Sequence, residues 1–220
     1  MVVFYNLIRH KRFLILLILL ITIRFSQAQV LVGYSFGNYL GNSISNIDCM
    51  AEQVSYEQGF TRPIKTHDWN RGLKMGLKIG SDNAKYFFAI NPYRSHYYGE
   101  GIDTVYGYNK RYDFKFWYTV VQFAGLDVGE SKGPGFGFSF DLDIIRLKYK
   151  ITLADSDLKY EKYYGGITVG YSLWARVNPA ERISLMLTYN GMLLNSPMKN
   201  YYYYYRVSNL SLGLVILLGG

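Results

Sequence analysis

Apolar and polar side chains alternate along much of the chain. The clearest segments are 71–80, 135–144 and 166–177, in each of which every second residue is apolar. A β-strand sends successive side chains to opposite faces, so each segment has one wholly apolar face. Weaker copies of the pattern lie at 30–37, 86–90, 111–120, 182–189 and 209–218. Because no segment after residue 28 shows sustained helical spacing, the pattern predicts an all-β chain of eight strands.

The second face of these segments shows which environment surrounds the strands. It carries mostly Gly, Ser and Thr with scattered charges, as in the alternation of Gly135, Gly137 and Ser139 with phenylalanines. A soluble sheet would expose many Lys, Glu, Asn and Gln residues there, whereas small residues suit a confined interior and bulky apolar ones suit lipid. The sequence therefore predicts an eight-stranded antiparallel up-and-down transmembrane β-barrel. The alternative architecture is a soluble periplasmic β-sandwich that acts as a binding module.

Connection lengths give an independent test of the barrel. Short connections are expected at 81–84, 125–134 and 178–181, and long ones at 41–70, 91–104, 146–164 and 191–205. Short turns that alternate with long loops are typical of outer-membrane barrels, in which the short turns face the periplasm. A β-sandwich has no reason to alternate them.

The first 28 residues have the layout of a secretory signal peptide. They contain four basic residues and no acidic one, an apolar run over 13–23, and then Ser26-Gln27-Ala28. As a helix the apolar run would cover about 16 Å, whereas a bilayer core needs about 30 Å. We expect cleavage after Ala28, which leaves residues 29–220 as the barrel domain.

Charge and cysteine content narrow the function classes. The 220 residues carry 24 Lys and Arg against 16 Asp and Glu, and half of the net charge of +8 lies in the predicted signal peptide. No concentrated basic stripe remains, so the sequence does not indicate nucleic-acid binding. A single Cys, Cys49, can form neither an intramolecular disulfide nor a cysteine-based zinc site. We assign no cofactor and no metal.

These features together resemble a known family. The signal peptide, the eight alternating strands, the alternating connections and the apolar last strand at 210–218 are similar to small outer-membrane barrel proteins of the OmpA/OmpX-like type from Gram-negative bacteria. The turn at 178–182 looks like barrels of the Bacteroidetes. The resemblance implies a monomer in the cell outer membrane that contacts outer-membrane lipids. It also implies insertion by the outer-membrane assembly machinery with periplasmic chaperones.

Nine charged residues are predicted to face the lumen. They are Lys74, Lys78, Arg111, Asp113, Lys115, Asp141, Asp143, Arg176 and Arg182. An eight-stranded barrel is just wide enough for side chains to fill it. Because an unpaired buried charge is costly, we expect the aspartates to pair with lysines and arginines. Such a network would plug the lumen, so the sequence does not indicate a general porin.

The predicted function is structural or depends on contacts at the cell surface. The long loops at 41–70 and 191–205 are the candidate sites for a surface ligand. The alternative is a lipid A or phospholipid modifying barrel enzyme, because barrel enzymes of this kind use His with Ser and an acidic residue. His67 and His96 are the histidines of the mature chain, but a His-x-Ser pattern is absent. We therefore assign no catalytic residue.

Overall fold

The computed structural model describes residues 28–40, 48, 49, 51–53, 55, 56, 67, 69–80, 84–102, 107–130, 132–153, 159–194, 196, 197 and 204–219. Apart from Ala28, which begins the first strand, the predicted signal peptide lies outside these residues. Residues 48, 49, 51–53, 55 and 56 are helical. Among the described residues, no helix has the length and hydropathy to cross a bilayer.

Eight long strands form a closed antiparallel ring. Their bounds are β1 Ala28–Tyr39, β2 Trp69–Gly80, β3 Ala84–Ile102, β4 Asn109–Gly129, β5 Pro134–Leu153, β6 Lys159–Ala180, β7 Ile183–Met192 and β10 Ser208–Leu218. Each long strand pairs with the next one along the chain, and pairing of β1 with β10 closes the barrel. The strands β8 Ser196–Pro197 and β9 Tyr204–Tyr205 form a separate small sheet. The ring confirms the predicted fold class.

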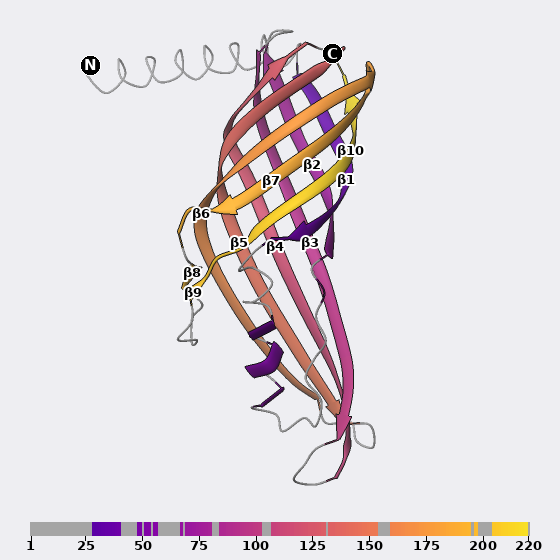
Figure 1. Ribbon diagram of the computed structural model, residues 1–220, viewed down its shortest axis with the longest axis vertical. Helices are drawn as coiled ribbons and strands as arrows, with labels where there is room; N and C mark the ends of the chain where they lie inside the picture. Colours follow the sequence, from indigo (N-terminus) through magenta and orange to yellow (C-terminus); the bar gives the residue numbers. More distant parts are fainter. Residues whose placement is uncertain are drawn as a thin grey trace, which may run out of the picture.

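The two ends of the barrel differ. The short connections after β2, β4 and β6 lie at one end with the C-terminus, which we call the turn end (Figure 1). There Lys132 and Glu181 join two of these turns through an ion pair of 2.5 Å. β1 and β7 end, and β2 and β10 begin, at the opposite end, which we call the loop end.

Four adjacent strands continue beyond the barrel at the loop end. Strands β3 to β6 have 19, 21, 20 and 22 residues, whereas the other four have 10 to 12. We call the segments 95–102, 109–116, 147–153 and 159–164 the projection, and Figure 1 shows them below the barrel. At about 3.3 Å per residue the projection adds roughly 26 Å. The prediction of loops over 91–104 and 146–164 is therefore wrong, because most of these residues are paired strand.

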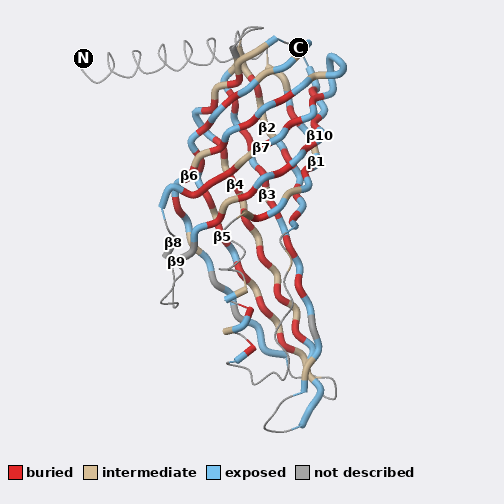
Figure 2. Tube along the Cα trace, viewed as in Figure 1, coloured by how far each residue is buried: buried red, intermediate tan, exposed pale blue. Residues whose placement is uncertain are grey.

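The outer surface of the barrel is apolar and the inner surface is mostly polar. Figure 2 shows buried and exposed residues alternating along the strands, as the two-residue period requires. In β10 Leu210, Leu212, Leu214, Ile216 and Leu218 face outward, while Asn209 and Ser211 are buried inside. In the closed ring each long strand has a partner on both sides, and the apolar exterior suits the hydrocarbon of a bilayer.

We call the apolar outer surface of the barrel the apolar band. The apolar residues change from the outer to the inner face where the strands leave this band. In β5 they occupy outward positions from Phe136 to Ile144 and inward positions from Ile145 to Ile151, and the strand has no irregularity between them. The backbone alternation is unchanged, but the medium outside changes from hydrocarbon to water. The projection is therefore patterned like a soluble sheet, with Lys148 and Lys150 on its outer face.

This change of faces corrects the assignment of β4. The residues buried inside are Tyr112, Phe114, Phe116, Tyr118 and Val120. Arg111, Asp113 and Lys115 lie on the outer face and not in the lumen, because this half of β4 stands in or next to the projection. A bulge between Phe123 and Leu126, with φ of 50° at Ala124, then shifts the alternation by one residue.

Two apolar clusters fill the interior on either side of a polar layer. The loop-end cluster includes Tyr97, Phe116 and Leu147, and it is covered by Ala51 from the helical stretch. The turn-end cluster contains Leu31, Phe87, Ala89, Trp174, Met186, Val215 and Leu217. The barrel thus has an apolar layer near each end and polar side chains between and beside these layers.

A matched pair of leucine substitutions tests the apolar band. We expect Leu214→Arg, near the middle of the outer row of β10, to lower the free energy of unfolding in vesicles by about 2–4 kcal/mol. The matched control is Leu194→Arg, which lies at the loop end beyond β7 and should cost about 0–1 kcal/mol. Equal losses, measured by denaturant titration of the reconstituted protein, would contradict the position of the band.

Candidate functional site

A buried ion cluster lies near the turn end of the lumen. Asp127 of β4 accepts a hydrogen bond of 2.8 Å from the Nζ of Lys78 on β2. The Nε of Arg176 on β6 lies 3.0 Å from both carboxylate oxygens, and Trp174 Nε1 donates to Oδ1 at 3.0 Å. We call these four residues the lumen ion cluster. It joins three strands and surrounds one carboxylate with donors, which offsets the cost of burying the charge.

Glycines make room for the lumen ion cluster. A Cβ at Gly137 would collide with the indole ring of Trp174, and a Cβ at Gly135 would lie 2.7 Å from the Cζ of Arg176. In the β5–β6 pairing, Gly135 lies opposite Arg176 and Gly137 lies opposite Trp174. The small residues that favoured a confined interior in the sequence therefore have a specific use, because they accommodate the largest side chains of the cluster.

A second network of neutral and acidic groups crosses the middle of the lumen. Asp141 accepts hydrogen bonds from the hydroxyls of Ser139, at 2.6 Å, and Ser172. Asp143 accepts one of 3.2 Å from Tyr118, and its other oxygen has no hydrogen-bond partner among the described residues. Further side-chain bonds join Asn91 to Gln122, Gln122 to Ser139, Asn190 to Tyr93 and Tyr93 to Ser211. The network spans strands β3 to β7 and β10.

Lys74 is a buried lysine that lies between these two groups. Its Nζ stands 5.3 Å from the centroid of the Phe87 ring, in the geometry of a cation–π contact. In the part of the chain that the structure describes, this Nζ has no hydrogen-bond partner. Lys74 therefore relies on the ring and on the field of nearby carboxylates, whereas Lys78 has a direct ion pair.

The nine charges predicted for the lumen separate into two groups. Lys74, Lys78, Asp141, Asp143 and Arg176 are buried inside the barrel. Arg111, Asp113 and Lys115 are on the outer face, and Arg182 is exposed in the turn before β7, so their prediction is wrong. Asp127 was missed. Asp127 lies between the apolar residues Leu126 and Val128, and this alternation indicates a strand. The sequence instead predicts a turn over 125–134, because the bulge between Phe123 and Leu126 interrupts the alternation.

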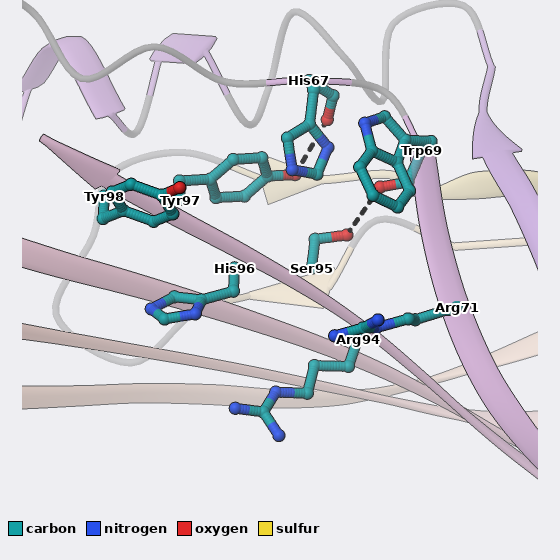
Figure 3. A pocket seen from close by; sticks show the side chains of 8 residues that line it. All are labelled: His67, Trp69, Arg71, Arg94, Ser95, His96, Tyr97 and Tyr98. Atoms are coloured by element: carbon teal, nitrogen blue, oxygen red, sulfur yellow. Dashed lines mark hydrogen bonds between the residues drawn. The ribbon is translucent and has the colours of Figure 1, made fainter.

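A pocket of about 440 Å³ lies on the outside, where β2 begins beside β3 (Figure 3). We call it the rim pocket. Its lining residues are His67, Trp69, Arg71, Arg94, Ser95, His96, Tyr97 and Tyr98. The His67 ring stacks on Trp69 and contacts the ring of Tyr97, each with centroids 4.7 Å apart. Guanidinium groups beside aromatic rings suit an anionic or sugar-containing ligand.

The two histidines have no catalytic arrangement with serine among the described residues. His96 Nε2 lies 3.1 Å from Asp113 Oδ1 on the outer face. Its neighbour Ser95 points to the other face and donates to the backbone carbonyl of Trp69 at 3.2 Å. A nucleophile must lie within hydrogen-bond reach of its base, and adjacent residues of one strand face opposite ways.

Comparison with known proteins gives matches in structure only. No protein-family model and no curated protein matches the sequence. Ail, the attachment invasion locus protein of Yersinia pestis, solved with the heparin analogue sucrose octasulfate, is 10% identical, with 87% of this chain and 97% of Ail covered and a TM-score of 0.45. Neisserial surface protein A is 11% identical, with 87% and 97% covered and a TM-score of 0.42. The N-terminal β-barrel domain of Pseudomonas aeruginosa OprF is 12% identical, with 86% and 98% covered and a TM-score of 0.34.

The lumen ion cluster should be important for stability. We expect Asp127→Asn to lower the free energy of unfolding by about 3–5 kcal/mol, because it leaves Lys78 and Arg176 buried without their counter-ion. Urea titration of the folded protein in detergent would measure this loss. The matched control is Glu181→Gln, which removes the exposed pair with Lys132 and should have almost no effect. A similar result for both variants would show that the cluster is not stabilising.

Proposed function

We propose that this chain is an outer-membrane barrel that acts through contacts at the cell surface and not by passing solutes. In this arrangement the turn end faces the periplasm and the loop end faces the medium. The apolar exterior of the closed ring and the short turns at one end support this orientation. Insertion by the assembly machinery and periplasmic chaperones, and a monomeric state, remain predictions.

The observation that carries the proposal is the projection. Its four strands continue the barrel sheet without a break in pairing between them, so a stiff element stands roughly 26 Å beyond the barrel. Its inner face holds part of the loop-end cluster, and its outer face carries charged and aromatic side chains. A barrel that only stabilised the membrane would not need such an element.

The filled interior supports the same function. Large side chains such as Phe87 and Trp174 near the turn end, and Tyr97 and Phe116 near the loop end, are buried in the interior. Between these layers stand the hydrogen-bonded Asp141 and Asp143. A barrel of eight strands leaves no wide channel around such side chains.

The candidate ligand surface extends beyond the loops predicted from the sequence. Parts of the 41–70 and 191–205 loops lie outside the described residues. Of those described, Cys49, Tyr56, Leu193 and Leu194 are exposed at the loop end. The rim pocket and the outer face of the projection add a surface built on strands, which holds its side chains in place better than a loop does.

Thiol labelling of intact cells tests the orientation. In a background without the exposed native thiol, Cys49→Ser, we expect Thr152→Cys on the projection to react with a membrane-impermeant maleimide. The control Lys132→Cys, in a turn at the other end, should react only after the cells are lysed. Labelling of Lys132→Cys alone in intact cells would reverse the proposed orientation.

Planar-bilayer recording tests the closed lumen. We expect the reconstituted protein to give no steady conductance, because two apolar layers and the lumen ion cluster occupy the interior. A general porin in the same bilayer provides the positive control. A stable open state would contradict the filled lumen, and loss of that state in Asp141→Ala would locate the path in the polar network.

A further inference from the structure

A row of cations crosses the outer face where the projection begins. Arg71 of β2 pairs with Arg94 of β3, which pairs with Trp117 of β4, and Trp117 pairs with Arg146 of β5. All four side chains point outward. We call these residues the arginine row. It places three guanidinium groups on one continuous register line of the sheet.

No described residue serves as an acidic partner of the arginine row. Arg71 and Arg94 lie directly opposite each other on neighbouring strands. Like charges in such positions destabilise a sheet. Among the described residues, no carboxylate lies within ion-pair distance of Arg71, Arg94 or Arg146. Of the three guanidinium groups, that of Arg94 contacts a described aromatic ring: its Cζ lies 5.9 Å from the centroid of the Trp117 ring. Within the part of the chain that the structure describes, the positive charge of the row is therefore not balanced by carboxylates.

The next row towards the tip of the projection is different. There His96 lies 3.1 Å from Asp113, and Lys148 forms an ion pair of 2.9 Å with Glu161. Acidic residues are thus available on this face and are paired with other cations. Among the described residues, the absence of carboxylates is therefore local to the arginine row and does not extend over the whole surface.

The position of the arginine row indicates what the cations meet. The parallel register line of Met75, Ile90, Val121, Leu142 and Val169 faces outward and belongs to the apolar band. Arg94 follows Ile90 on β3 at a distance of roughly 13 Å along the strand. Trp117 in the row is also typical of the boundary between hydrocarbon and water. The phosphate groups of bilayer lipids lie just outside the hydrocarbon, and the proposed membrane orientation puts these guanidinium groups at that level.

Two hollows beside the row provide space for headgroups. The rim pocket contains Arg71 and Arg94, as Figure 3 shows. A second pocket of about 520 Å³ is lined by Trp117, Thr119, Arg146, Leu147, Tyr163 and Gly165. A Cβ at Gly165 would have one near neighbour, the carbonyl oxygen of Ile145 at 3.5 Å, so the missing side chain leaves this hollow open.

We propose that the arginine row binds the phosphate groups of glycolipids in the outer leaflet around the barrel. Guanidinium groups form paired hydrogen bonds with phosphate, and bound phosphates would neutralise the like charges that oppose each other across β2 and β3. The aromatic rings in the two hollows would contact the sugar part of the headgroup. The inference rests on the proposed membrane orientation.

Native mass spectrometry of the folded protein in detergent tests this site with bisphosphorylated lipid A as the probe. We expect the triple variant Arg71→Gln, Arg94→Gln, Arg146→Gln to bind lipid A at least about tenfold more weakly, since each lost charge-assisted contact is worth about a factor of ten. Dephosphorylated lipid A should bind wild type and the triple variant equally. As a second variant, Gly165→Leu should weaken binding of the phosphorylated lipid by filling one hollow without changing charge.

The control variant is Arg111→Gln, Lys150→Gln, Lys159→Gln, which removes three cations from the projection away from the row and should bind as wild type does. Equal weakening in this control would show a general effect of charge and overturn the proposal, as would tight binding of lipid A by the arginine variant. Displacement of lipid A by inorganic phosphate would assign the row to a soluble anion instead. A heat-dependent gel shift separates the two proposals: its absence in wild type contradicts the barrel, whereas normal shifts without phosphate selectivity contradict only the arginine row.

Discussion

The change of medium along the outer surface is the constraint on which the rest of the structure depends. Strands β3 to β6 are continuous, and their side chains alternate without interruption through the change in β5. Their outer face meets hydrocarbon over one part and water over the other. The apolar residues must therefore point outward in the first part and inward in the second. This single requirement accounts for the polar lumen, for the apolar core of the projection and for the cations at the boundary between them.

The buried polar side chains of the interior obtain their partners in two ways. Around Asp127, charged groups are paired directly, and neighbouring glycines leave space for the bulky donors. Around Asp141 and Asp143, hydroxyl and amide groups supply the hydrogen bonds. Both arrangements draw on several strands at once, so each ties together parts of the ring that backbone pairing does not connect. The polar core can thus specify the cross-section of the barrel as well as fill it.

The sequence predicts the fold well and the site only in part, for physical reasons that individual strands illustrate. In β5 the alternation identifies the lumen positions of Asp141 and Asp143, because the rule of apolar side chains facing lipid holds there. In β4 the same rule fails at Arg111 to Lys115, because water surrounds that half of the strand. The bulge at Ala124 also shifts the inward and outward alternation of β4 by one residue, and a periodic pattern does not predict such a shift. The arginine row could not be predicted from the sequence either. It depends on the register of four strands, and strand pairing, not local sequence, determines that register.

Closure of the ring also has a consequence for the order of assembly. The contact between β1 and β10 joins segments close to the two ends of the described chain, as in the pairing of Val30 with Leu218. Every other long strand pairs with a neighbour in sequence, so hairpins can form early and locally. The final seam must instead wait until the last strand has been delivered, and its formation carries the largest loss of chain entropy. Until that moment both seam strands present unpaired edges, and a second chain could occupy them. Catalysed insertion would therefore protect this seam more than any other part of the barrel.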